Sequence, residues 1–231
     1  NLFENIKNGT FRVNLHVHTQ KSDGSLTPEQ YLEQSTLYAN KIAKLFHNDG
    51  LPVYTSATTD HNNIEAAQEI IAMTAEEPKK YKNFKFIPGC EFLFLDNNSG
   101  FRFPAFEAVG LGFNPFSQRI AEILKDINSI DIIKKLVNKN AVFSYAHPIR
   151  YYFTGNGVTA EFIKYLRKIG INGIESNYQY VGYKDTPEMI SQKQHIQKIA
   201  KENNFFETGG TDTHGKNIFR PFAQTYLDKL I

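Results

Sequence analysis

Short apolar runs alternate with longer helical stretches along the whole chain, and this alternation most constrains how it can fold. Seven of the runs are rich in β-branched or aromatic residues, and several end at Gly, Asp or His, as strands do. Strands are predicted at residues 11–16, 52–59, 84–95, 107–113, 141–146, 171–176 and 205–211. Helices are predicted at residues 28–45, 64–75, 116–138, 159–169 and 187–203. Strands that alternate with helices indicate an α/β fold with a largely parallel sheet.

One connection departs from this rhythm. The third and fourth predicted strands are joined by residues 96–100, which read Asp-Asn-Asn-Ser-Gly, and a short aromatic stretch, so a hairpin is favoured there. Seven strands in 231 residues suit a slightly short barrel better than an open doubly wound sheet, which remains the alternative. Since no repeat or linker divides the sequence, residues 1–231 are expected to form a single domain.

Composition excludes several classes of protein. Hydrophobic residues make up 41% of the chain, which is enough for a substantial core. The formal net charge of +2 argues against a basic arm, an acidic tail and binding to long duplex nucleic acid. A single cysteine excludes an intramolecular disulfide and any multi-cysteine zinc cluster.

The location of the protein is predicted only weakly. No apolar run approaches the ~20 residues that span a bilayer, so no membrane partner is expected. The single cysteine and the lack of a visible export signal favour the cytoplasm. Because the chain begins at Asn1 and not at Met, an exported form stays open. The oligomeric state is left open as well.

Polar residues collect at the carboxyl ends of the predicted strands, where α/β barrels place their sites. Residues two apart in an extended segment point the same way, so a His-x-His or an Asp-x-His can face one ion. Imidazole and carboxylate ligands suit Zn, Mn or Fe. A carboxylate within the apolar stretch 87–95 needs a partner, usually a metal or an Arg. The residues in these positions are His16, His18, Asp60, His61, Glu91, His147, Glu175, Asp212 and His214.

Six ordered motifs extend this pattern over essentially the whole chain. They are His-x-His, Ser-Asp-Gly, Thr-Asp-His, Gly-x-Glu, Ala-His-Pro and Asp-x-His, and residues 22–28 read Ser-Asp-Gly-Ser-Leu-Thr-Pro. The set resembles the PHP (polymerase and histidinol phosphatase) family, and within it the small stand-alone phosphoesterases. This resemblance implies a distorted seven-stranded (β/α)7 barrel with two or three divalent ions (Mn, Fe or Zn) at its C-terminal face.

The resemblance also implies which residues bind the ions. The implied ligands are His16, His18 and Asp212 for the first ion, Glu91 as a bridge, His147 for the second, and Asp23, His61 and His214 for the third. In the family a further His often supplies the second ion just before a Val-Gly-Leu-like segment. Here that place is held by Glu107, which would replace a nitrogen ligand by a carboxylate or weaken the second site. A site richer in carboxylates leans toward Mn or Fe over Zn.

Two or three divalent ions close together suit phosphoester hydrolysis, in which a metal-bound hydroxide attacks the phosphorus. We expect the substrate to be a phosphomonoester of a small metabolite or a nucleotide. Arg150 is expected either to contact the phosphate, with a part in catalysis, or to form a surface ion pair, and Arg220 is a weaker candidate for a phosphate contact. Tyr151 is expected to stack on a base or to cover the barrel rim. Asp60 is expected to orient a metal ligand or to accept a proton, and Glu175 to orient a ligand.

Two other functions stay open from sequence. The first is a phosphodiesterase or exonuclease that acts on short oligonucleotides, since a short end bound in a pocket needs few phosphate contacts. The second is a non-catalytic metal-binding module, against which the near-complete set of ligands counts.

Overall fold

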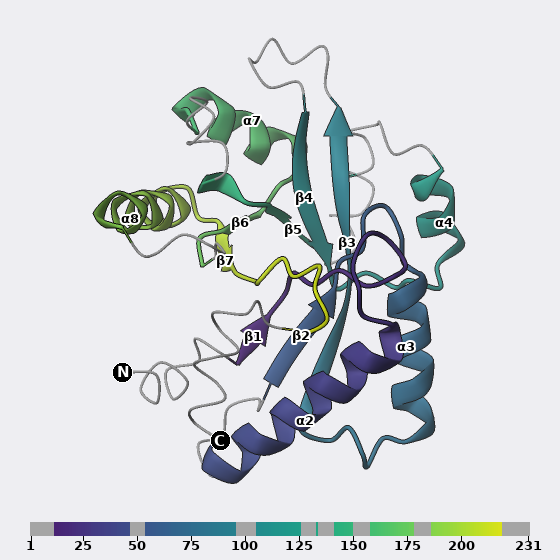
Figure 1. Cartoon of the computed structure of the whole chain (residues 1–231). Helices are drawn as coiled ribbons and strands as arrows, with labels where there is room; N and C mark the ends of the chain where they lie inside the picture. Colours follow the sequence, from purple (N-terminus) through teal and green to yellow (C-terminus); the bar gives the residue numbers. More distant parts are fainter. Residues whose placement is uncertain are drawn as a thin grey trace.

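Seven strands form one sheet, in the spatial order β1-β2-β3-β4-β5-β6-β7 (Figure 1). The computed structural model describes residues 12–46, 54–95, 105–125, 133, 141–149, 158–177 and 186–218. The strands are β1 (Val13–Asn14), β2 (Tyr54–Thr58), β3 (Phe84–Leu95), β4 (Ala105–Leu111), β5 (Val142–Tyr145), β6 (Gly173–Glu175) and β7 (Phe206–Thr208). The described helices are α2 (Pro28–Phe46), α3 (Glu65–Glu76), α4 (Gln118–Leu124), α7 (Ala160–Ile169) and α8 (Pro187–Glu202). The predicted α/β class and the seven strands are confirmed.

Strand β4 runs against both of its neighbours, whereas the other four pairings in the sheet are parallel. Strands β3 and β4 pair from Gly89 opposite Leu111 to Leu95 opposite Ala105, so the predicted antiparallel excursion is confirmed. Their connection, residues 96–104, lies outside the described residues. These two antiparallel pairings depart from the repeated parallel unit of a complete (β/α)7 barrel.

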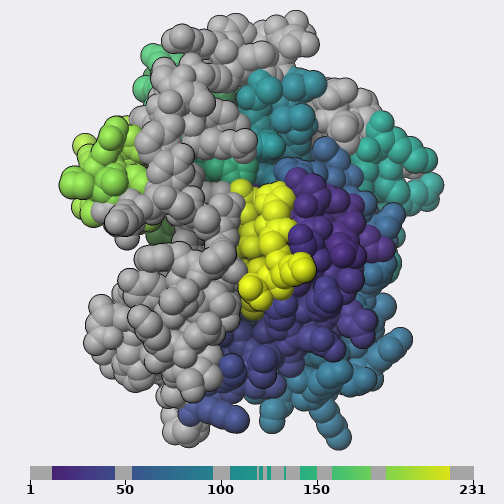
Figure 2. All heavy atoms as spheres, viewed as in Figure 1, coloured from purple at the N-terminus to yellow at the C-terminus, as the bar shows by residue number. Residues whose placement is uncertain are grey.

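The segments that follow β1 and β7 lie side by side and draw the first and last strands together. Leu15 N donates to Gly209 O at 3.0 Å, and Asp212 N donates to His16 O at 2.8 Å. In Figure 2 the yellow residues after β7 lie against the purple residues after β1. The sheet is therefore curled into a half-barrel, which fits a barrel-like α/β fold.

Alternation along each strand gives the sheet two different faces. Outward side chains such as Phe92, Phe106 and Tyr145 are buried in the main hydrophobic core, to which α7 contributes. Cys90 belongs to this core, since it lies on the opposite face of β3 from its neighbour Glu91. Inward side chains, among them Ala57 of β2 and Val109 of β4, form a separate small cluster inside the curl. Because successive side chains point to opposite faces, the side chains of Glu91 and Glu107 point to the same inward face as that of Val109.

The helices begin and end largely where the sequence indicates. Thr27 Oγ1 accepts from Gln30 N, and Thr186 Oγ1 accepts from Met189 N, so each of these Thr-Pro pairs caps the start of a helix. Helices α2 and α3 pack on β2 and β3 and on each other, and α8 packs on β7 (Figure 1). Of the helix predicted at 116–138, α4 accounts for residues 118–124, and nearly all of the rest lies outside the described residues. None of the described helices combines the length and apolar character needed to cross a bilayer.

Candidate metal centre

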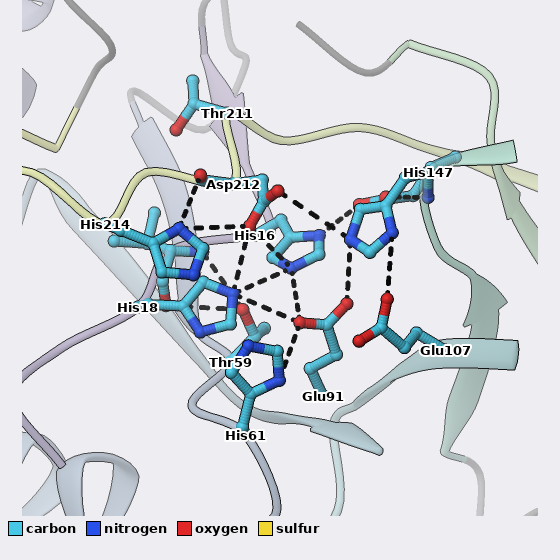
Figure 3. Close-up of polar contacts among 12 residues, drawn as sticks. His16, His18, Thr59, His61, Glu91, Glu107, His147, Thr211, Asp212 and His214 are labelled. Carbon is cyan, nitrogen blue, oxygen red and sulfur yellow. Dashed lines mark hydrogen bonds and ion pairs between the residues drawn. The ribbon is translucent and has the colours of Figure 1, made fainter. Parts of the chain in front are cut away.

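All nine residues predicted as metal ligands belong to the described part of the chain, and their ligand atoms lie close together in overlapping groups. Figure 3 labels all of them except Asp23. They come from the ends of β1, β2, β5 and β7, from the interior of β3 and β4, and from the turn after β1. Their ligand atoms form overlapping groups in which all atoms lie within 4.8 Å of one another. These groups are His16/His18/Glu91/Asp212, His18/Asp23/His61/His214, His61/Glu91/Glu107 and His16/His147/Glu175.

The first group is buried at the centre. His16 Nε2 and His18 Nε2 lie 3.1 Å apart and each lies 3.2 Å from Glu91 Oε2. Asp212 Oδ1 is 3.2 Å from His18 Nε2 and 3.5 Å from His16 Nε2. The structure thus brings together the four residues that were expected to surround the first ion.

Glu91 occupies the middle of the cluster and divides its two oxygens between neighbours. Oε2 faces the two central histidines and His61 Nδ1, which is 3.3 Å away, and Oε1 lies 2.9 Å from His147 Nε2. Both oxygens are buried, yet neither makes a hydrogen bond of good geometry. A buried carboxylate with nitrogens on both sides and no aligned donor fits a cation between these atoms. The residues therefore suit the divalent ions expected from sequence.

A second group opens toward the surface. Asp23 Oδ1 lies 3.2 Å from His214 Nε2, and Asp23 Oδ2 lies 3.7 Å from His61 Nε2. The side chain of Asp23 is 58% exposed, and those of His61 and His214 about a third. His214 Nδ1 is 3.1 Å from Asp212 O, and a donated proton there leaves the Nε2 lone pair directed at Asp23. These are the residues expected to hold a third ion, with His18 joining them through Nδ1, 3.6 Å from Asp23 Oδ1.

The carboxylates raise the pKa values of the buried histidines. Burial alone would lower the pKa of His16, but Glu91, Glu175 and Asp212 outweigh it and hold that pKa well above 6.5. The pKa of His18 is raised by Asp212 and Glu91 against the same effect of burial. Without an ion, protons supply the positive charge that these carboxylates demand.

The pKa values of two carboxylates and of His214 are lowered instead. Burial would raise the pKa of Glu91, but His16 and His147 hold it well below 4.5. The pKa of Asp212 is likewise held below its ordinary value, against burial, by His16. Burial and the nearby His18 lower the pKa of His214, which favours the neutral imidazole that a metal ligand requires.

The backbone at the site adopts an unusual conformation at two residues and is tightly packed at two glycines. His147 (φ 39°) and Asp212 (φ 45°) both adopt the left-handed region, which side chains other than Gly rarely occupy. Gly210 lets the chain after β7 approach β1, because a Cβ there would lie 2.3 Å from His16 Cβ. Gly24 does the same for the turn after β1, where a Cβ would lie 2.3 Å from His18 O. Because they lack a side chain, both glycines allow the segments that carry the proposed ligands to lie in close contact.

Two buried carboxylates support the ligands from behind. Glu175 Oε1 lies 2.9 Å from His16 Nδ1, and its Oε2 accepts from His147 N at 2.9 Å, as expected for a residue that orients ligands. Asp60 lies outside the ligand groups: Oδ1 accepts from Thr19 N and Ser22 Oγ, both at 2.7 Å, and Oδ2 accepts from Thr19 Oγ1. Of the two roles predicted for Asp60, this geometry favours the supporting one.

Sequence reasoning missed the two hydroxyls that face Asp60. Ser22 belongs to the Ser-Asp-Gly motif, which was the available signal, but Thr19 carries none. Arg150, Tyr151 and Arg220 lie outside the described residues, so their expected contacts with substrate stay predictions.

Several solved structures share this fold, and two of them illustrate the likeness. One is a proposed metal-dependent phosphoesterase from Bifidobacterium adolescentis, with a TM-score of 0.59 and 15% identity over 93% of this chain and 94% of that one. Another is an amidohydrolase from Chromobacterium violaceum with bound sulfate and no metal, with a TM-score of 0.58 and 15% identity over 94% and 96% of the two chains. No family model and no curated protein matches the sequence. At this identity the likeness establishes the fold, which extends over nearly the whole length of all three chains.

Proposed function

We propose that this protein is a metal-dependent phosphoesterase of the PHP type, which hydrolyses a phosphomonoester of a small metabolite or nucleotide. The observation that carries the proposal is the continuity between two ligand groups: a buried one around Glu91 and an open one around Asp23, joined through His18. A deep group can retain ions, while an adjoining open group can meet a substrate. The curled sheet is, in this proposal, a distorted (β/α)7 barrel with the site at its C-terminal face.

The residues fit two or three divalent ions, for which we propose Mn, Fe or Zn. The proposed ligands are His16, His18, Asp23, His61, Glu91, His147, Asp212 and His214. Ions held there would neutralise phosphate charge and make water a better nucleophile at neutral pH.

The chain's own residues do the positioning. Glu175 fixes the ring of His16, and Asp60 holds the turn that presents Asp23. Because His16, His18 and Glu91 are buried, the proposed route for substrate passes Asp23, which is exposed, and the partly exposed His61 and His214.

Residues beyond the described part of the chain complete the proposal. Arg150 comes directly after Ile149, close in sequence to His147, so we propose that it contacts the phosphate. Arg220 is proposed as a second contact and Tyr151 as a stacking partner for a base.

The fold shared with a proposed phosphoesterase supports phosphoester chemistry. The fold shared with an amidohydrolase supports amide hydrolysis as a second candidate. A phosphodiesterase acting on short oligonucleotides and a non-catalytic metal-binding module complete the set of functions that an experiment must separate.

The test is a substrate screen coupled to metal analysis. Protein stripped with a chelator and reloaded with Mn, Fe(II) or Zn is assayed on phosphomonoesters, short single-stranded oligonucleotides and amides. We expect the wild-type protein to release phosphate. In a His16→Ala, His18→Ala double variant, the rate of release should fall more than about 100-fold, which exceeds the loss caused by replacing a residue that only orients a ligand. A His195→Ala variant, which changes an exposed histidine of α8, serves as the matched control.

Each other outcome has a clear meaning. Phosphate release that persists in the double variant would overturn the proposal. Cleavage of amides or internal oligonucleotide bonds without release of monoester phosphate would favour the corresponding alternative. Fewer than one tightly bound ion per chain would favour a non-catalytic module.

A further inference from the structure

Two buried histidines on opposite sides of Glu91 share one arrangement of their ring nitrogens. His16 directs Nε2 into the cluster, 3.2 Å from Glu91 Oε2 and 3.5 Å from Asp212 Oδ1. Its other nitrogen, Nδ1, lies 2.9 Å from Glu175 Oε1. One edge of the ring therefore faces the ligand cluster, and the other faces a carboxylate behind it.

His147 repeats this arrangement with a different carboxylate. Its Nε2 lies 2.9 Å from Glu91 Oε1 and 3.9 Å from Asp212 Oδ2. Its Nδ1 lies 3.4 Å from Glu107 Oε2, and Figure 3 shows the Glu107 side chain beside that edge of the ring. Glu107 therefore faces Nδ1 of His147 as Glu175 faces Nδ1 of His16, but as an ion pair at 3.4 Å without a hydrogen bond of good geometry, whereas Glu175 and His16 are hydrogen-bonded at 2.9 Å.

The side on which Glu107 approaches the ring decides what it can do. The two ring nitrogens of an imidazole point away from each other, so an oxygen near Nδ1 is not on the side of Nε2. A carboxylate on Nδ1 holds the proton there, fixes the ring orientation and leaves Nε2 as the ligand atom. His147 needs such support because its backbone is in the left-handed region and its side chain is 3% exposed.

We propose that Glu107 is a positioning residue that orients His147 through Nδ1, in a pair that mirrors Glu175 and His16, and not the ion ligand that the sequence leads one to expect. The inference rests on the metal site of the proposed function. The alternative, that Glu107 is an ion ligand, also has a structural basis, because an oxygen of Glu107 lies within 4.8 Å of ligand atoms of His61 and Glu91. A ligand role is therefore the outcome against which the proposal is tested.

Two substitutions separate the roles. In Glu107→Gln the carboxamide oxygen can still accept a proton from Nδ1, but an amide is a poor ligand for these ions. Glu107→Ala removes both capacities. The full-length protein and both variants are loaded with Mn, and bound ions per chain are counted by elemental analysis, with affinities from calorimetry. The exposed Glu33 of α2, changed to Gln, is the matched control.

A positioning role predicts an unchanged number of ions in all variants. Affinity falls by about 10–100-fold in Glu107→Ala, the range for outer residues that orient ligands, and Glu107→Gln recovers most of it. The absorption spectrum of the Co-loaded protein should stay the same in Glu107→Gln, since the ligand set is intact.

Loss of one ion per chain in both variants would show that Glu107 is a ligand and overturn the proposal. Parental affinity in Glu107→Ala would overturn it too, since a residue that orients nothing can be removed without effect. Wild-type protein that binds no ion at all would instead contradict the proposed function.

Discussion

Ser22 Oγ donates a hydrogen bond to Asp60 Oδ1 at 2.7 Å and so ties the turn after β1 to the end of β2. The same carboxylate accepts from Thr19 N and Thr19 Oγ1. Asp23 follows directly on this turn and faces His214. A buried carboxylate that touches none of the proposed ions thereby sets the position of a residue that would bind one.

Replacing Asp60 should weaken the open group and spare the buried one. Asp60→Ala leaves the buried Thr19 N without its acceptor, which costs roughly 1–3 kcal/mol of stability. We expect the weakest-bound ion to lose about 10–100-fold in affinity, measured by calorimetry, with the tighter ions retained. Asp60→Asn keeps Oδ1 as an acceptor and should be the milder change. If Asn is as inactive as Ala while ion content is normal, Asp60 is the proton acceptor instead.

Gly210 should not tolerate a side chain. A Cβ at this position would lie 2.6 Å from His16 N, a backbone atom that cannot move aside without disturbing β1. We expect Gly210→Ala to lower the melting temperature and to bind Mn more weakly in calorimetry. Gly215→Ala is the control, because its added Cβ meets nothing closer than 3.9 Å. Equal behaviour of the two variants would show that the close approach at His16 is not required.

Metal-free protein should be most stable in mild acid. The pKa values of His16, His18 and His147 are raised above 6.5, so their contribution is complete below 6.5 and is lost as pH rises through the raised values. The pKa values of Glu91 and Asp212 are lowered, so their contribution is present above 4.5 and is lost as pH falls through the lowered values.

Thermal unfolding in a chelator should therefore give a maximum between pH 4.5 and 6.5 for the contribution of these five groups, which outnumber His214, whose lowered pKa works against stability below pH 6.5. Added Mn should stabilise the protein more at about pH 8 than at about pH 5.5, because ions bind deprotonated imidazole. A metal-free melting temperature that climbs steadily from pH 6.5 upward would contradict this account.

Two phenylalanines, one buried and one exposed, should differ sharply in the stability that is lost when each is replaced by alanine. Phe106 of β4 is 1% exposed and packs against Phe94 and Phe162, so Phe106→Ala should cost about 3–5 kcal/mol. Phe206 of β7 is 62% exposed, so Phe206→Ala should change stability by less than about 0.5 kcal/mol. Chemical denaturation measures both, and comparable losses would show that the outer face of β7 is covered in solution.

Much of the fold could be predicted from the sequence, because the local pattern of apolar and turn residues matches the positions of the strands. The strand predicted at residues 84–95 coincides with β3, and its antiparallel pairing with β4 agrees with the hairpin that the sequence favours there. The bounds at β6 and β7 were predicted too long. Their flanking apolar residues, such as Ile171 and Phe205, are buried without joining the ladder.

The candidate site was predictable in membership but not in internal arrangement. Strand ends and His-x-His spacing predicted that these side chains lie in one place, and the structure brings them together. Which ring nitrogen faces which carboxylate depends on side-chain torsions and on contacts made across the whole fold. That is why Glu107 reads as a ligand in the sequence and lies beside His147 Nδ1 in the structure. The supporting hydroxyls of Thr19 and Ser22 depend on the fold in the same way.

The backbone hydrogen bonds between the segments after β1 and β7 also have a consequence for folding. Asn14 and Thr211, which are bonded across the same junction, are 197 residues apart along the chain. Contacts of such long sequence separation form late, because closing a long loop costs chain entropy before the contacts repay it. A nascent chain therefore holds His16 and His18 long before Asp212 emerges, and the full set of ligands exists only after Asp212 and His214 have been synthesised. Ions bound to this set would add to the hydrogen bonds that already join the segments after β1 and β7, and so would stabilise the closed ends of the sheet further.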